Sequence, residues 1–233
     1  MNYLSHELEH VKNELAEMGQ LVLGQLEKGA EALLNHDRDS AHEILANEKR
    51  INSYELSLDR LCANILALYN PVAVDLRFVL AVLKITTSLE RIADNLESVA
   101  YYTLEIEDPF DQELLDMLGA AEMFRNCNEM LSKVLLSLDT EKPKLAREVF
   151  KQDKILDDLN IEAPGKIAKY IRANPDKAIE PTLALLSVFR KLERVGDQTK
   201  NMGEEVIYYV KAKVVKHKKN RAPKKKTKPD SEK

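Results

Sequence analysis

One seven-residue pattern occurs twice in this sequence, and the two copies lie 103 positions apart. Residues 89–95 read LERIADN, and residues 192–198 read LERVGDQ. A second correspondence, at an offset of 105, begins with Met18 and Met123 and continues in order through the segments that precede each motif. Self-similarity on this scale indicates that one structural unit is present twice. The repeat therefore predicts two units of about one hundred residues in tandem.

Residues that break helices are scarce in this chain and gather at a few points. Of 233 residues only seven are Gly and eight are Pro, while 44% are hydrophobic. The stretches between these points are rich in strong helix formers, and the short connections favour antiparallel neighbours. The predicted fold class is all-α, with two tandem three-helix bundles, six long helices and a pseudo-twofold repeat. The helices are expected at residues 3–35, 39–69, 72–106, 110–138, 143–173 and 176–213.

Two prolines lie within these predicted helices. Pro164 and Gly165 interrupt the fifth predicted helix, so a kink or a break is expected there. Pro181 lies near the start of the last helix, where the missing N–H costs least if the helix begins one turn later than residue 176.

The charge of the chain is unevenly distributed. Residues 1–107 form the first predicted repeat, residues 108–213 the second, and residues 214–233 a basic tail that is expected to be disordered. Between residues 211 and 233 there are eleven Lys and Arg against two acids, a net charge of +9. The whole chain carries −4, so the rest of it carries −13. Such an acidic body would repel a phosphate backbone and argues against specific binding of nucleic acid.

The sequence predicts a cytoplasmic protein. Its start carries Glu7 and Glu9 instead of the basic and apolar blocks of a secretion signal. No apolar run approaches the roughly 20 residues that span a bilayer. Cys62 and Cys127 lack metal-binding spacing and are expected to be buried thiols.

Acidic residues recur four positions apart on the helices that flank two of the expected turns. Glu90 and Asp94 stack on one helix face, and Glu48 and Asn52 do the same on the preceding helix. In a symmetric hairpin that turns at Pro71, Glu48 faces Asp94 and Asn52 faces Glu90. The second repeat has the same spacing around its own turn. The candidate metal-binding residues are Glu48, Asn52, Glu90, Asp94, Asp153, Asp157, Glu193 and Asp197.

Clustered carboxylates repel one another, so their charge must be offset. Hard cations, neighbouring arginines and solvation on an exposed face are the alternatives. Oxygen-only ligation without histidine suits Mg²⁺, Mn²⁺, Ca²⁺ or ferric iron better than zinc or copper. Because Asn52 replaces a carboxylate in the first set, the second set is expected to bind metal more tightly.

No catalytic centre is predicted. Paired carboxylates act as acid and base only where different surroundings split their pKa values within a cleft, and the sequence indicates neither. It also has no Gly-rich phosphate loop, no GxSxG and no HExxH. The chain is therefore predicted not to be an enzyme and to have no catalytic or organic-cofactor residues.

The two motifs and their surroundings match a known family. LERIAD at residues 89–94 and LERVGD at residues 192–197, in tandem three-helix halves, resemble the PhoU family of bacterial phosphate-signalling regulators. NPVAVDLR at residues 70–77 and Asn201 after the second motif are further matching features. The resemblance covers about residues 3–213.

The resemblance implies a cytoplasmic, usually homodimeric regulator that restrains the phosphate-starvation (Pho) regulon and tempers phosphate uptake by the Pst ABC transporter. Its partners would be the ATPase of that transporter and the sensor histidine kinase of the phosphate two-component system, with membrane contact only through these partners. Some members bind metal through ExxxD motifs, which here fall on Glu90 with Asp94 and on Glu193 with Asp197. Iron, zinc, manganese and magnesium are the candidate ions.

Two other classes of function stay open at this point. One is a carboxylate-cluster metalloprotein with a storage or hydrolytic activity. The other is a nucleic-acid or membrane-surface protein that binds through its Lys-rich tail.

Overall fold

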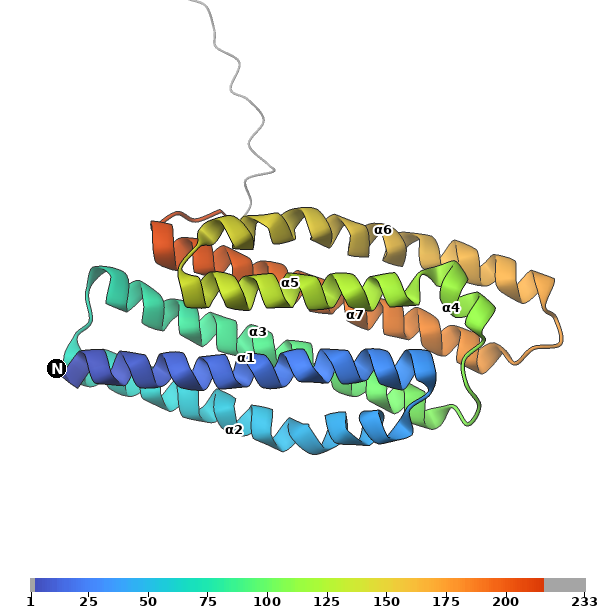
Figure 1. Ribbon diagram of the computed structural model, residues 1–233, viewed down its shortest axis with the longest axis horizontal. Helices are drawn as coiled ribbons and strands as arrows, with labels where there is room; N and C mark the ends of the chain where they lie inside the picture. The colour runs from blue at the N-terminus through green and yellow to red at the C-terminus, as the bar shows by residue number, and fades with distance from the viewer. Residues whose placement is uncertain (1–2, 216–233) are drawn as a thin grey trace, which may run out of the picture.

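The computed structural model describes residues 3–215, and these residues form seven α-helices joined by short connections (Figure 1). No helix in this part of the chain is long and apolar enough to cross a bilayer. The predicted all-α fold is confirmed, while residues 216–233, most of the predicted tail, lie outside the described residues. The helices are α1 (Tyr3–Asn35), α2 (Arg38–Tyr69), α3 (Ala73–Glu105), α4 (Gln112–Leu118), α5 (Ala120–Thr140), α6 (Pro143–Ala173) and α7 (Ile179–Lys211).

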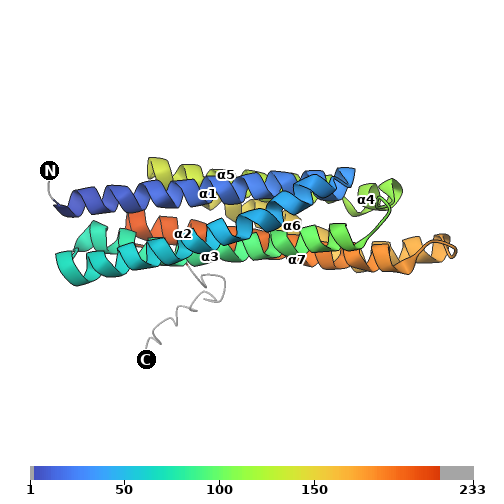
Figure 2. The same cartoon turned by 90° about the horizontal axis from the view of Figure 1, so that it is seen from below.

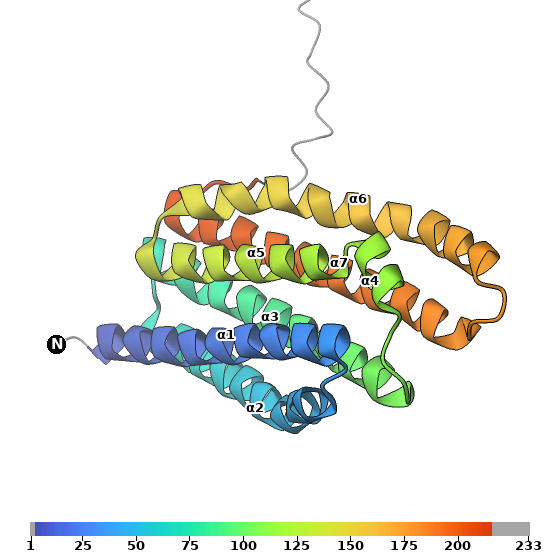
Figure 3. The ribbon, with the colours of Figure 1, turned by 45° about the vertical axis from the view of Figure 1, so that its right-hand side comes forward.

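Helices α3 and α7 lie side by side at the centre and run in opposite directions (Figures 1 and 3). The ring of Phe78 on α3 lies 5.2 Å from that of Tyr209 on α7, measured between centroids. Further along α3, and further back on α7, Lys84 Nζ lies 3.0 Å from Glu205 Oε2. Helices α1 and α5 are also neighbours (Figure 2). The two repeats therefore share a long interface.

The apolar residues of the two motifs are part of the buried core. Leu89 and Ile92 on α3, and Leu192 and Val195 on α7, are fully buried. Their spacing of three places them on one helix face. Burying each such side chain stabilises the fold by about 1.5–3 kcal/mol. With the apolar face turned inward, the acidic residues of the same motifs are left on the outer face of each helix.

The fourth predicted helix is broken in two. The sequence predicted one helix over residues 110–138, but α4 ends at Leu118 and is followed by Gly119, where φ is 80°. The N–H of Gly119 donates to the backbone oxygens of Leu115 and Asp116, which closes the last turn of α4. Glycine adopts this left-handed conformation without steric cost, and the helix cannot continue through it. The prediction of a single helix was wrong because an isolated Gly in a helical pattern does not by itself mark an end.

Pro164 and Pro181 occupy different positions in their helices. Pro164 lies inside α6, which is continuous from Pro143 to Ala173, so the helix is not broken there. Pro164 is exposed while Ala163 and Ile167 beside it are buried, so the turns on both sides of the lost hydrogen bond are held by packing. Helix α7 begins at Ile179, about one turn after the predicted start at residue 176. Pro181 therefore falls in its first turn, as expected.

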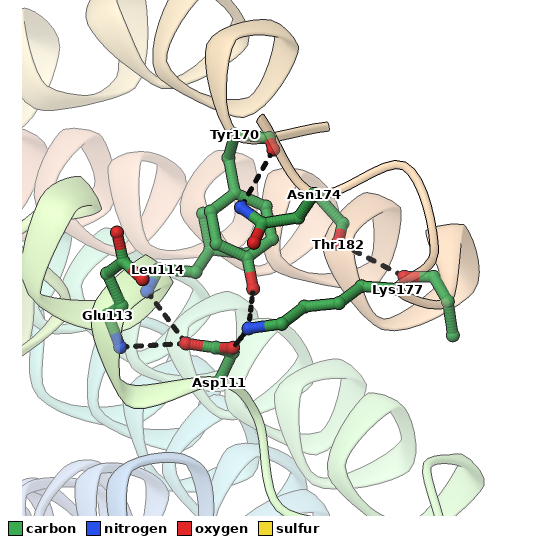
Figure 4. A network of polar contacts seen from close by, with 8 residues as sticks. Asp111, Glu113, Leu114, Tyr170, Asn174, Lys177 and Thr182 are labelled. Carbon is green, nitrogen blue, oxygen red and sulfur yellow. Dashed lines mark hydrogen bonds and ion pairs between the residues drawn. The ribbon is translucent and has the colours of Figure 1, made fainter. Parts of the chain in front are cut away.

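Asp111 joins the start of α4 to the connection between α6 and α7 (Figure 4). Its Oδ1 accepts hydrogen bonds from the N–H groups of Glu113 and Leu114, which makes it the N-cap of α4. The ammonium of Lys177 pairs with the other oxygen of Asp111 and donates to the hydroxyl of Tyr170 at 3.0 Å. The hydrogen bond from Lys177, followed by that from Tyr170, lowers the pKa of Asp111 to about 2.

Replacing Asp111 with alanine should lower the free energy of unfolding by about 1–2 kcal/mol at neutral pH, the usual cost of losing a helix cap. The pKa of Asp111 is depressed, so its contribution is full above about pH 4 and is lost as the pH falls toward 2. Urea unfolding at neutral pH and near pH 2 measures this change. Equal differences between wild type and Asp111→Ala at both pH values would contradict it, and Asp116→Ala, on the same helix, serves as the control.

Candidate functional site

Four carboxylates from α6 and α7 gather on the surface of the second repeat. Burial raises the pKa of Glu193, and the nearby charges of Asp197, Asp157 and Asp153 raise it further. The structure thus brings the four candidates of this repeat together across the α6–α7 hairpin. We call Asp153, Asp157, Glu193 and Asp197 the second acidic cluster.

A lysine that the sequence analysis did not single out lies within the second acidic cluster. Lys200 Nζ is 2.5 Å from Asp153 Oδ2 and 2.7 Å from Asp197 Oδ1. Asp153 is only 7% exposed, so the ion pair is partly removed from water. Burial alone would lower the pKa of Lys200, but the hydrogen bonds to the two carboxylates raise it above its ordinary value. The amine is therefore charged at neutral pH.

The first repeat gathers acids from α2 and α3. Burial raises the pKa of Glu90, and the charges of Asp94 and Glu55 add to the shift. Burial likewise raises the pKa of Glu97, with the charges of Glu48 and Asp94 adding to it. None of these acids forms an ion pair with a basic side chain among residues 3–215. We call Glu48, Asn52, Glu55, Glu90, Asp94 and Glu97 the first acidic cluster.

The first acidic cluster includes two acids, Glu55 and Glu97, outside the pairs of the symmetric hairpin. Glu48 was predicted to face Asp94, and Asn52 to face Glu90. In the structure Asn52 donates to Glu48 on its own helix at 3.0 Å, and the charge of Glu55 contributes to the raised pKa of Glu90. Side chains lean toward the N-terminus of their helix, so antiparallel neighbours lean in opposite directions along the hairpin. A residue of α2 or α6 therefore meets a residue of α3 or α7 that lies nearly one turn farther from the hairpin turn.

The same lean explains the two residues that the sequence analysis missed. It brings Glu97 to Glu48 in the first repeat and Lys200 to Asp153 in the second. Glu97 and Lys200 are equivalent positions, 103 residues apart, and each lies three residues after the Asp of its motif. That spacing keeps them on the acidic face and was the signal available in the sequence.

Neither cluster is arranged as a ready-made metal site. Within residues 3–215 no group of three or more His, Cys, Asp or Glu side chains converges closely enough to hold a metal ion. In the second acidic cluster, an ammonium lies between two of the predicted ligands, Asp153 and Asp197. In the first, the carboxylates are oxygen donors without a basic neighbour in ion-pair contact. Its donor set therefore fits a hard cation better.

The motifs of the two repeats meet in an open, mostly polar depression of about 590 Å³ over α3 and α7. Asp94 and Asp197, one from each cluster, both line it. Arg91 and Arg194, the arginines of the two motifs, also line it, and neither forms an ion pair with the rest of the described chain. The depression therefore connects the two acidic clusters and offers free guanidinium groups beside them. Its lining residues are Arg91, Asp94, Asn95, Glu97, Ser98, Lys191, Arg194, Asp197 and Gln198.

Comparison with known proteins gives the same result for the sequence and for the fold. The model of the PhoU domain matches the chain twice, at residues 15–103 and 120–206. A phosphate-specific transport system accessory protein PhoU homolog from Burkholderia sp is 30% identical over 212 residues, which cover 91% of this chain and 90% of the relative. The phosphate-specific transport system accessory protein PhoU of Escherichia coli (strain K12) is also 30% identical, over 91% of this chain and 86% of that protein.

Two solved structures share the fold. The crystal structure of PhoU from Pseudomonas aeruginosa matches with a TM-score of 0.82 and 30% sequence identity, over 90% of this chain and 99% of that one. The crystal structure of the phosphate transport system regulatory protein PhoU from Streptococcus pneumoniae matches with a TM-score of 0.80 and 25% identity, over 91% and 99% of the two chains. With a domain match in each repeat and relatives that align over almost their whole length, the chain belongs to the PhoU family.

Proposed function

We propose that this protein is a regulatory accessory component of the phosphate-specific transport system. The observation that carries the proposal is the extent of the family match, which includes the motifs of both repeats and 91% of the chain in relatives that bear this name. In this role the protein restrains the phosphate-starvation regulon and tempers phosphate uptake by the transporter. It acts in the cytoplasm as a homodimer.

The protein acts by binding other proteins rather than by catalysis. Its proposed partners are the ATPase of the phosphate transporter and the sensor histidine kinase of the phosphate two-component system. A site that binds and converts a small molecule usually encloses most of the surface of that molecule. The depression over α3 and α7 is open and mostly polar, and it carries the unpaired guanidinium groups of Arg91 and Arg194. Such a surface suits contact with acidic side chains of a partner protein.

A metal cation in the first acidic cluster is part of the proposal. Its carboxylates offer oxygen donors that no lysine or arginine of residues 3–215 contacts as an ion pair. Iron, zinc, manganese and magnesium are the candidate ions, and an all-oxygen set favours manganese, magnesium or ferric iron over zinc. A bound cation would relieve the repulsion among these acids and tie α2 to α3.

Cells that lack this protein should express a phosphate-starvation reporter even when phosphate is plentiful, because nothing then restrains the sensor kinase. The measurement is reporter activity in high and low phosphate, in the deleted strain with an empty plasmid and with a plasmid that encodes the wild-type chain. Repression in high phosphate should return only with the encoded protein. A reporter that stays silent in the deleted strain would remove the basis of this proposal.

A further inference from the structure

Lys200 occupies the position that a metal ion bound to both Asp153 and Asp197 would take in the second acidic cluster. It extends from α7, one turn after Asp197, and its ammonium bridges Asp197 on its own helix and Asp153 on α6. A divalent ion bound to both carboxylates needs metal–oxygen distances of about 2.0–2.6 Å. It would therefore sit within a few ångströms of the ammonium and compete with it for the same oxygens.

We propose that the Lys200 ammonium is the resident cation of the second acidic cluster and keeps metal ions out of it. The like-charge repulsion between the ammonium and an entering ion is strong because Asp153 is nearly buried and water screens the pair poorly. Displacing Lys200 would also break two charge-assisted hydrogen bonds. The chain itself thus supplies one positive charge to the second acidic cluster, between Asp153 and Asp197.

The equivalent position of the first repeat carries the opposite charge. Glu97 stands where the second repeat has Lys200, and it adds a carboxylate beside Glu48 and Asp94. The same position of the repeat therefore adds a carboxylate to the first acidic cluster and a competing ammonium to the second. The second set was expected from the sequence to bind metal more tightly. With Lys200 in place, the first acidic cluster is the tighter site.

Mn²⁺ binding to the purified full-length protein tests the inference, with free Mn²⁺ followed by electron paramagnetic resonance. Lys200→Gln should gain a Mn²⁺ site or tighten binding by about tenfold or more, since a positive charge next to the site is removed. Adding Asp197→Asn to Lys200→Gln should abolish that gain. Lys211→Gln removes a charge from the exposed end of the same helix, outside any ion pair and away from the depression, and should leave Mn²⁺ binding unchanged.

Two further variants separate exclusion by charge from a general loss of structure. Lys200→Arg keeps a positive charge and should not gain a site, while circular dichroism confirms that each variant is helical. Asp197→Asn alone should leave the Mn²⁺ binding of the otherwise wild-type protein unchanged. Three results would each overturn the inference: unchanged Mn²⁺ binding in Lys200→Gln, an equal gain in Lys211→Gln, or loss of Mn²⁺ binding on Asp197→Asn alone. The titration uses purified protein, so its outcome is independent of the reporter that tests the regulatory role.

Discussion

Replacing Gly196 with valine should lower the free energy of unfolding by about 3 kcal/mol, at the upper end of the usual cost of overpacking. Gly196 is the glycine of the second motif and is buried between α7 and α6. A Cβ atom at this position would lie 2.3 Å from Leu156 Cδ1, and Leu156 is itself fully buried. Either Leu156 must leave its rotamer or the two helices must move apart. Both responses also disturb Asp153, one turn before Leu156 on α6.

Denaturation in urea, followed by circular dichroism, measures this effect. Gly24→Val is the matched control, because Gly24 also lies within a helix but a Cβ there would meet nothing within 4 Å. Valine is a better helix former than glycine, so Gly24→Val should be neutral or slightly stabilising. If the two variants proved equally stable, the close approach of α6 and α7 at Gly196 would be refuted.

Replacing Phe189 with alanine should cost about 3–5 kcal/mol, the range found for deletion of buried aromatic side chains. Phe189 is fully buried on α7, one turn before the second motif. It is the largest fully buried side chain among the described residues. Its removal leaves a cavity beside the central α3–α7 pair that surrounding helices can fill only in part. The loss should therefore lower the thermal stability of both repeats together.

Calorimetry and urea denaturation of Phe189→Ala give the measurement. Leu183→Ala on the same helix is the control, since Leu183 is 50% exposed and its truncation should change stability by less than about 0.5 kcal/mol. A loss for Phe189→Ala no larger than that of the control would mean that the core around α7 is loosely packed.

The helices of this protein were predictable from sequence wherever their ends carry strong local signals. Asn70 with Pro71 and the segment before Pro143 mark two such ends, and the structure ends and starts helices there. Gly119 was not predictable as a break, because its conformation depends on how α4 packs against α6 as much as on its own flexibility. Pro164 shows the reverse, since packing of the flanking turns keeps a helix continuous through a residue that usually ends one.

The acidic clusters were predictable as neighbourhoods but not as sets of partners. Spacing by four places Glu90 with Asp94 on one face, and a short turn opposes α2 to α3, so the gathering of acids follows from sequence alone. The partner of Asp153 could not be predicted in the same way. Its partner Lys200 depends on the direction in which side chains lean along two antiparallel helices, and a count of residues from the turn omits that direction.

The central pair of helices also determines the order in which the chain can fold. Lys84 and Glu205, which pair across α3 and α7, are separated by 121 positions, whereas each hairpin joins helices that are consecutive in the chain. Closing a long loop costs more conformational entropy than closing a short one, and contacts between distant segments slow folding. The α2–α3 and α6–α7 hairpins can therefore form before α3 meets α7, and we expect the docking of the two halves to limit the folding rate.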